Sequence, residues 1–313
     1  MPPQDLADFD PPCTSMHWAT FEFNYRLDVQ RLMPHIAAME AYNEAAFTRV
    51  LPLWWREQSG ELNPIGTEDN PLSQPELSRP LGLLSRIEKQ QLRIRRVSQA
   101  RAWVRERFVP GSAPLSLEDI LTMHRMLTAG YASAGILRTT PVEVGRCGVG
   151  GIHQGAPPEK LPRLLDQYIQ FVNGKEPLSR HPVIHALSAH FFFVALHPFA
   201  DGNGRVSRLL QAAILFQHGY NVHGGYALSN YFYENRDKYE TLLYQCLQRC
   251  PFDLTPFVAF GMEGLLIELQ AISSFLKTRL HRTVGRTKAN RGSQIKSQIK
   301  EDQTPPPASN KPI

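Results

Sequence analysis

Apolar residues recur every three or four positions along most of this chain, a spacing typical of amphipathic helices. The segment 114–130 also carries boundary signals, with Ser116 placed as an N-cap and Gly130 beyond the end. Glu118 and Asp119 fall in its first turn, where acidic residues favour a helix. Further helices are predicted at 17–58, 81–108, 159–173, 181–196, 205–218, 234–249 and 254–276. The pattern therefore predicts an all-α fold.

One segment departs from this helical pattern. Residues 142–144, "VEV", have the composition of a strand, and five glycines follow within the eleven residues 145–155. Strand-forming residues next to a glycine-rich turn are typical of hairpins. We therefore expect one short β-hairpin, or flap, within 135–158.

Composition divides the chain into three parts. Residues 57–80 are dense in Gly, Pro, Asn, Ser and acids, which predicts a long loop. In the helical segment before it, Pro34 predicts a break or a helix start nearby. The end of the chain is repetitive and polar, as in "SQIKSQIK" and "TPPPASNKP". We expect an N-terminal helical extension and loop over 1–80, a main domain over 81–279, and a basic, disordered tail over 280–313.

Charge is concentrated in that tail. The net charge is +5, but the residues from Lys277 onward hold nine Lys or Arg and two acids, which leaves a balance of −2 for the rest. A nucleic-acid-binding core is therefore not expected. No run approaches the roughly 20 apolar residues of a membrane helix, and the N-terminus has no Sec-type signal pattern. The few, irregularly spaced cysteines predict a reducing compartment, without disulfides or a zinc site, and hence a cytoplasmic protein: Cys13, Cys147, Cys246 and Cys250.

The segment 197–208, "HPFADGNGRVSR", joins two predicted helices. The first helix must end near His197, because the proline that follows disfavours helical geometry there. The second begins around Arg205. Gly202 and Gly204 between them permit positive φ and close approach of a ligand to the backbone. Their N–H groups can converge at a helix N-terminus, which favours a bound anion such as phosphate.

The polar side chains of this segment fit the chemistry of phosphate transfer. Arg205 and Arg208 are three residues apart and share a helix face, so both can grip phosphate oxygens. Asp201 can hold Mg²⁺ against the same phosphates, and Asn203 can donate a hydrogen bond to them. His197 can take a proton from a hydroxyl near neutral pH. Together these residues predict phosphoryl or nucleotidyl transfer.

Each feature also has an ordinary structural explanation when taken alone. A "DGNG" segment is usually a surface turn, and two nearby arginines are usually a solvated helix face. The other histidines of the preceding helix, at 181, 185 and 190, have no acidic residue among them and are expected to pack or cap rather than bind metal. The conjunction of a His, an acid and two Arg at these offsets is what favours a functional site.

This segment resembles the Fic family signature, His-x-Phe-x-(Asp/Glu)-Gly-Asn-Gly-Arg-x-x-Arg. Every fixed position is met: His197, Phe199, Asp201, Gly202, Asn203, Gly204, Arg205 and Arg208. Similarity extends over roughly 80–275, through "PGSAPLSLEDILTMHRML", "GILRTTPVEVG", "APPEKLPRLL" and "DLTPFV". The resemblance implies a Fic-type helical bundle with a β-hairpin flap. It also implies an enzyme that transfers AMP from ATP to a hydroxyl side chain of another protein, releasing pyrophosphate.

The resemblance implies a role for each matching residue. His197 would be the general base, Asp201 would hold Mg²⁺, and Phe199 would anchor the segment in the core. The expected phosphate ligands are Gly202, Asn203, Gly204 and Arg205 for the α- and β-phosphates, and Arg208 for the γ-phosphate. Tyr239, in "NRDKYETLL", would lie near the adenine. The flap near 143–152 would pair with an extended segment of the target.

Many Fic proteins also carry an inhibitory helix with the pattern (Ser/Thr)-x-x-x-Glu-(Gly/Asn). "LLSRIEKQQ" offers Glu88 upstream of the signature, but Leu84 and Lys89 stand where the pattern has other residues. Glu88 is therefore either an inhibitory residue or part of a Glu–Lys helix surface.

Other activities and partners stay open within this interpretation. The domain could transfer UMP or phosphate, remove AMP, or serve as a non-catalytic nucleotide-binding adaptor, although an adaptor has no need of His197. The sequence leaves the target protein, the role of residues 1–80 and the oligomeric state open, a homodimer included. Neither nucleic acid nor membrane is an expected partner.

Overall fold

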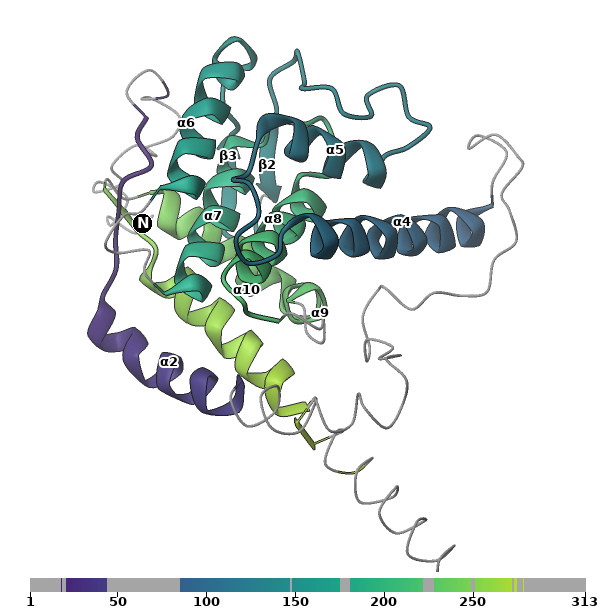
Figure 1. The fold of residues 1–313 in the computed structure, drawn as a ribbon. Helices are drawn as coiled ribbons and strands as arrows, with labels where there is room; N and C mark the ends of the chain where they lie inside the picture. Colours follow the sequence, from purple (N-terminus) through teal and green to yellow (C-terminus); the bar gives the residue numbers. More distant parts are fainter. Residues whose placement is uncertain are drawn as a thin grey trace, which may run out of the picture.

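The computed structural model describes the following residues: 18, 21–43, 85–146, 148–174, 181–221, 228–248, 251–271, 273, 274 and 278. The predicted loop at 57–80 and the predicted tail at 280–313 lie outside them. The described chain is mostly helical with two small sheets, which confirms the all-α class and the hairpin (Figure 1).

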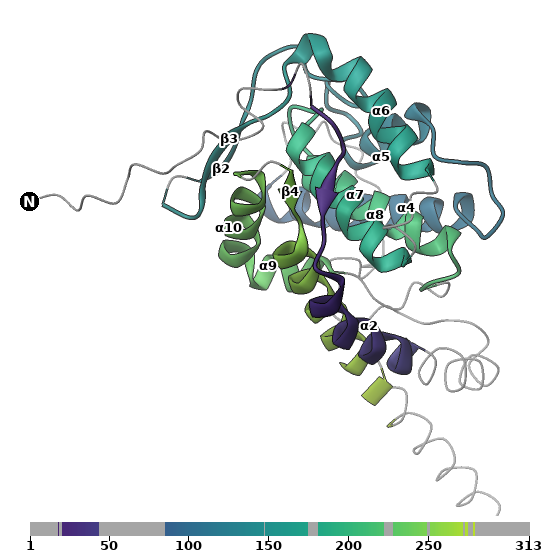
Figure 2. The ribbon, with the colours of Figure 1, turned by 90° about the vertical axis from the view of Figure 1, so that its left-hand side faces the viewer.

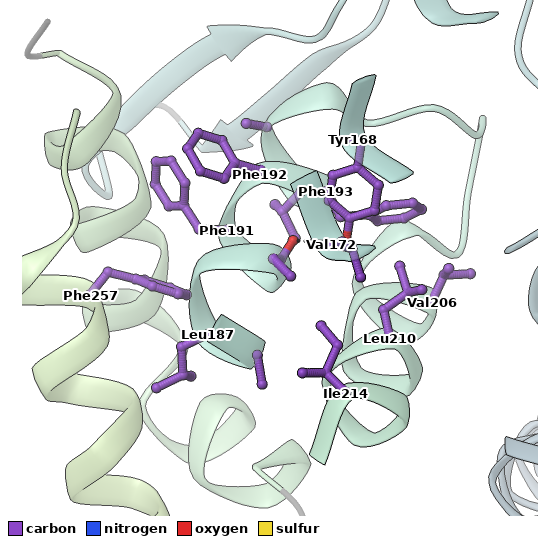
Figure 3. Close-up of a cluster of buried hydrophobic side chains, with 14 of the residues drawn as sticks. Tyr168, Val172, Leu187, Phe191, Phe192, Phe193, Val206, Leu210, Ile214 and Phe257 are labelled. Carbon is purple, nitrogen blue, oxygen red and sulfur yellow. Dashed lines mark hydrogen bonds between the residues drawn. The ribbon is translucent and has the colours of Figure 1, made fainter. Parts of the chain in front are cut away.

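Helix α7, Pro182–Leu196, lies at the centre of the fold (Figure 1). Every residue after its first proline is buried, because its sequence is apolar on all sides. Helices α6, Leu161–Asn173, and α8, Asn203–Gln217, pack against it. Figure 3 shows the core around α7, where Phe191 and Leu187 lie beside Phe257 of the helix over 255–271.

Helices α4, Arg86–Arg107, and α5, Leu117–Leu127, cover the other side of α8. The predicted N-cap Ser116 is confirmed: it forms a capping box in which its hydroxyl accepts from the Asp119 N–H and the Asp119 carboxylate accepts from the Ser116 N–H. The same carboxylate receives two hydrogen bonds from Arg107, at 3.0 and 2.9 Å. The end of α4 is thus tied to the start of α5.

The N-terminal region differs from the prediction of one helix over 17–58. Strand β1, Tyr25–Arg26, precedes helix α2, Val29–Asn43, and residues 21–28 are extended. The aromatic residues at 21, 23 and 25 alternate as in a strand and pack into the core, which explains the difference. Pro34 lies inside α2, which continues past it. Figures 1 and 2 show α2 alongside the helix over 255–271.

The remaining elements complete the surface near the end of α7. Strands β2, Glu143–Arg146, and β3, Gly151–Gln154, form the antiparallel flap, followed by the short helix η3, Pro158–Lys160. The flap projects from the helical body beside α10 (Figure 2). The predicted helix over 234–249 is confirmed as α10, Arg236–Leu247, and a short helix that was not predicted, α9, Ser229–Glu234, precedes it. Strand β4, Phe252–Asp253, pairs in parallel with β1, a contact that the sequence analysis does not predict.

Candidate active site

His197 terminates α7 in a left-handed backbone conformation, with φ 51° and ψ 58°. Its ring Nδ1 lies 3.2 Å from the carbonyl oxygen of Val194, which can only accept, so Nδ1 carries the proton and Nε2 carries the lone pair. Burial, together with the nearby Arg138 guanidinium, lowers the pKa of His197 to about 4. The half-buried ring is therefore neutral at physiological pH, in the tautomer that a base requires.

Arg138 holds the backbone at His197 and was not identified from the sequence. The Arg138 Nε donates to the His197 carbonyl at 2.6 Å, and its backbone N–H donates to the Pro198 carbonyl at 3.0 Å. The guanidinium also donates to the carbonyls of Thr140, at 2.8 Å, and Ala156. These carbonyls come from both sides of the flap and from the end of α7. Arg138 is buried and therefore fixes the flap base and His197 relative to each other.

The bend after His197 is closed by a hydrogen-bonded pair four residues apart. Asn203 accepts from the Phe199 N–H at 2.9 Å and donates to the Phe199 carbonyl at 2.8 Å. Both residues are buried, and the Phe199 ring lies in the core as the resemblance implies. The Asn203 amide is thus used within the loop, so a contribution of this residue to phosphate binding would come from its backbone.

The bend leads directly into the N-terminus of α8, which begins at Asn203 and not at Arg205 as predicted. Gly202 is its N-cap residue, with φ 87°, and no side chain caps the helix there. The first N–H groups of the helix therefore point out of its end with the positive end of the helix dipole. This end of α8, with Gly202 and Gly204, has the properties of a phosphate site.

The charged side chains of the signature lie around this helix end. The Asp201 carboxylate is 82% exposed and pairs with the Arg205 Nη2 at 3.0 Å. It also accepts from the Gly202 N–H at 2.6 Å. Arg208 lies one turn further along α8 and is partly buried. An exposed carboxylate next to arginines at a helix N-terminus suits a cation bridged to phosphate.

Tyr239 and Arg208 lie on the same side of the core. The Tyr239 hydroxyl is 2.8 Å from Nε2 of His190, a buried residue of α7. Burial lowers the pKa of His190 to about 3, and the positive charge of Arg208 contributes. Burial raises the pKa of Tyr239, while Arg208 opposes that rise. Tyr239 and Arg208 therefore both lie near His190.

The flap borders His197 directly. Buried His153 of β3 has a pKa lowered to about 4 by burial and by the neighbouring His197. A side chain at Gly155, directly after β3, would approach the His197 Cβ to 3.3 Å, so the flap passes close to His197. Arg146 of β2 donates to Asp237 at 2.6 Å and to Glu240 at 2.5 Å, both on α10. These contacts, like those of Arg138, join segments far apart in sequence, and no local pattern indicates them.

Glu88 lies in the first turn of α4, in a capping box with Ser85. The Glu88 carboxylate accepts from the Ser85 N–H at 2.8 Å, and the Ser85 hydroxyl accepts from the Glu88 N–H at 3.2 Å. This contact gives Glu88 a structural role of its own. Helix α4 packs against α8, the helix that bears Arg208.

Two classes of feature are not seen in the part of the chain that the structure describes. No three His, Cys, Asp or Glu side chains converge there as a protein-only metal site needs. Likewise, none of the described helices combines the length and apolarity required to cross a bilayer.

Residues 114–215 match the model of the Fic/DOC family. The chain is 30% identical over 167 residues to the protein adenylyltransferase Fic of Nematostella vectensis, covering 52% of this chain and 35% of that protein. It is 37% identical over 108 residues to the protein adenylyltransferase fic-1 of Caenorhabditis elegans, covering 34% of this chain and 20% of that protein. The alignments thus span about a third or less of these relatives.

The fold is also similar to solved structures. A Fic-1 fragment from C. elegans superposes with a TM-score of 0.57 at 21% identity, covering 80% of this chain and 73% of that chain. The likeness extends well beyond the residues of the family match.

Proposed function

We propose, from the Fic/DOC domain that this chain carries, that the protein transfers AMP from ATP to a Ser, Thr or Tyr hydroxyl of a target protein. The observation that carries the proposal is the His197 ring, whose Nδ1–H is bound to the Val194 carbonyl so that Nε2 can accept a proton. His197 opens the loop that leads into the uncapped N-terminus of α8. A base next to a phosphate site is what nucleotidyl transfer requires.

The phosphate groups would bind at the start of α8. Backbone N–H groups at Gly202 and Gly204 would receive the α- and β-phosphates with Arg205, and Arg208 would receive the γ-phosphate. The Gly202 N–H would exchange its contact with the Asp201 carboxylate for a phosphate oxygen. Helix N-termini and arginine guanidiniums both favour polyphosphate binding. Tyr239, whose hydroxyl contacts buried His190, is proposed to line the adenosine site on the ground of the family resemblance alone.

The transfer itself needs one proton acceptor. Nε2 of His197 would take the proton of the target hydroxyl as its oxygen forms a bond to the α-phosphorus. The bond from that phosphorus to the α–β bridging oxygen would break, and pyrophosphate would leave with the electron pair. Arg205 and the helix N-terminus would stabilise the charge that develops on the phosphate oxygens.

The residues present fit a bound Mg²⁺. Asp201 offers one exposed carboxylate beside the phosphate site, and a single carboxylate with phosphate oxygens is the coordination that Mg²⁺ commonly takes. The ion would neutralise charge on the α- and β-phosphates. Asp201 would exchange its contact with Arg205 for this ion.

The flap supports a protein as the acceptor. Its two strands form a two-stranded sheet next to His197, and such a sheet can receive an extended segment of a target by strand addition. A reducing, cytoplasmic setting is part of the proposal, because the four cysteines are few and irregularly spaced. A homodimer is not required for any step.

Radiolabelled ATP tests the activity directly. The protein is incubated with Mg²⁺, cell lysate and ATP labelled at either the α- or the γ-phosphate. We expect label from the α-position in protein bands, with a rate about a hundredfold to ten-thousandfold lower in His197→Ala. His218→Ala is the matched control, since His218 is an exposed histidine at the other end of α8. Label from the γ-position alone would replace the proposal with phosphate transfer.

Glu88 is proposed as an inhibitory residue, and two substitutions separate this role from helix capping. Glu88→Gln keeps a capping-box side chain but loses the charge, whereas Glu88→Gly loses both. If the Glu88 carboxylate inhibits by pairing with Arg208, both variants raise the rate of self-modification, by about tenfold or more, because that ion pair is lost. If capping is its whole role, Glu88→Gly lowers helix stability by about 1 kcal/mol and neither variant is faster. Thermal unfolding and label incorporation measure the two effects.

A further inference from the structure

His124 of α5 contacts the loop 197–208 from its buried side, and the proposed reaction gives it no role. The residue is 1% exposed. Its ring stacks on the Phe199 ring, with centroids 3.7 Å apart and planes within 3°. A buried, polar ring in face-to-face contact with the anchor of the loop is well placed to control the loop backbone.

Two hydrogen bonds fix the tautomer of this ring. The Gly135 N–H donates to Nδ1 at 2.9 Å, so Nδ1 carries the lone pair. Nε2 must then carry the proton, and it donates to the Asp201 carbonyl at 3.0 Å. This pair of bonds holds the ring in a single tautomer.

The bond from the His124 Nε2–H to the Asp201 carbonyl affects the backbone at the start of α8. The Asp201 carbonyl belongs to the same peptide plane as the Gly202 N–H, so a donor that holds the oxygen also sets the direction of that N–H. Gly202 has φ 87° and begins α8. A side chain at Gly202 would approach the His124 Cδ2 to 3.3 Å, so ring and loop backbone are already in close contact.

We propose that His124 is a positioning residue: its Nε2–H sets the main-chain orientation at Asp201 and Gly202, and hence the direction of the Gly202 N–H. This N–H contacts the Asp201 carboxylate in the structure and would turn to phosphate when nucleotide binds. The expected effect of His124 on nucleotide affinity rests on the proposed function. The expected effect on the conformation of the loop backbone does not.

Three variants separate the two hydrogen bonds from ring packing. The amide nitrogen of His124→Gln can stand in for Nε2–H, and the amide oxygen of His124→Asn can stand in for Nδ1. His124→Phe keeps the stack on Phe199 without either bond. The proposal expects the Gln variant to retain most of the wild-type affinity for ATP, and the Asn and Phe variants to raise KM for ATP by about tenfold. The turnover number should change less than KM, because His197 is untouched.

Hydrogen exchange at the Gly202 amide gives a second readout that needs no activity. We expect faster exchange in Asn and Phe than in Gln, at equal thermal stability of Gln and Asn. Equal exchange and equal KM in Gln and Asn would overturn the proposal and leave His124 as a packing residue. If the wild type transfers no label from ATP, the proposed function fails, and the exchange comparison alone decides the role of His124. If the Asn variant does not fold, the comparison of Gln with Phe decides it.

Discussion

Two segments border His197, and they are held in different ways. The loop 197–208 is fixed by buried hydrogen bonds to its main chain, from Arg138 at one end and Asn203 at the other. The flap at 143–154 is held on α10 by the more exposed Arg146 and its two carboxylates. The flap backbone also packs closely on α10, since a side chain at Gly151 would collide with the Tyr244 ring at 2.5 Å.

The difference matches what each segment has to do in the proposed reaction. Buried hydrogen bonds to backbone carbonyls allow one arrangement, because a broken bond leaves an unpaired polar group away from water. Exposed ion pairs are weak and are screened by salt. The position of His197 is therefore fixed in advance, whereas the outer part of the flap is held more weakly than its base, which Arg138 fixes.

The largest expected effect comes from removing the buried hydrogen bonds that hold the loop 197–208. Arg138→Met removes the donors of several buried carbonyls, so the free energy of unfolding should fall by about 3 kcal/mol or more. Urea unfolding measures it. Arg125→Met is the matched control, since its guanidinium is half-exposed and pairs with exposed Glu118, and it should cost under about 1 kcal/mol. Equal losses in both variants would contradict the comparison.

Acid titration tests the same buried region. Burial lowers the pKa of His190 to about 3 and that of His197 to about 4, below the ordinary value of about 6.5. Between pH 6.5 and pH 4 the unfolded chain therefore binds more protons than the folded chain. The free energy of unfolding should fall as pH drops through this window, by up to about 1.4 kcal/mol per pH unit for a fully buried ring.

Urea midpoints at pH 7, 6 and 5 measure this slope. His190→Gln cannot titrate there, so its stability should depend less on pH than that of the wild type. A wild-type midpoint that stays constant over this range would show that these rings are protonated equally in both states.

The smallest effect is expected on the flap side. Arg146→Gln should change the free energy of unfolding by about 1 kcal/mol or less, yet speed hydrogen exchange over 143–154. Adding salt to the wild type should move exchange in the same direction. Arg236→Gln is the matched control, because Arg236 pairs with the same Glu240 at 2.7 Å but lies on α10 itself. Equal exchange in the two variants would mean that glycine packing alone holds the flap.

Local signals predicted a large part of the fold. The cap at Ser116 and the end of α7 at His197 depend on residues within four positions, so the sequence carries them directly. The pairing of β1 with β4 could not be found in this way, because it joins two-residue strands more than two hundred positions apart. The aromatic alternation at 21, 23 and 25 was the one local sign that this region is extended.

The site follows the same division. The signature residues lie together because they share one loop and one helix turn, whereas Arg138 and His124 act on carbonyls 59 and 77 residues away. Asn203 is an intermediate case. Its partner Phe199 is only four residues away, so the contact is local. However, an amide side chain in a glycine-rich bend is as compatible with binding a ligand as with a hydrogen bond to the backbone.

The left-handed backbone at His197 has a consequence for attempts to engineer this protein. Most L-residues are strained by about 1 kcal/mol or more in that conformation, and glycine is the residue that adopts it freely. Selection of variants for heat resistance alone would therefore reward glycine at this position and discard the imidazole. A library screened without a functional assay would therefore favour more stable variants that lack the proposed proton acceptor.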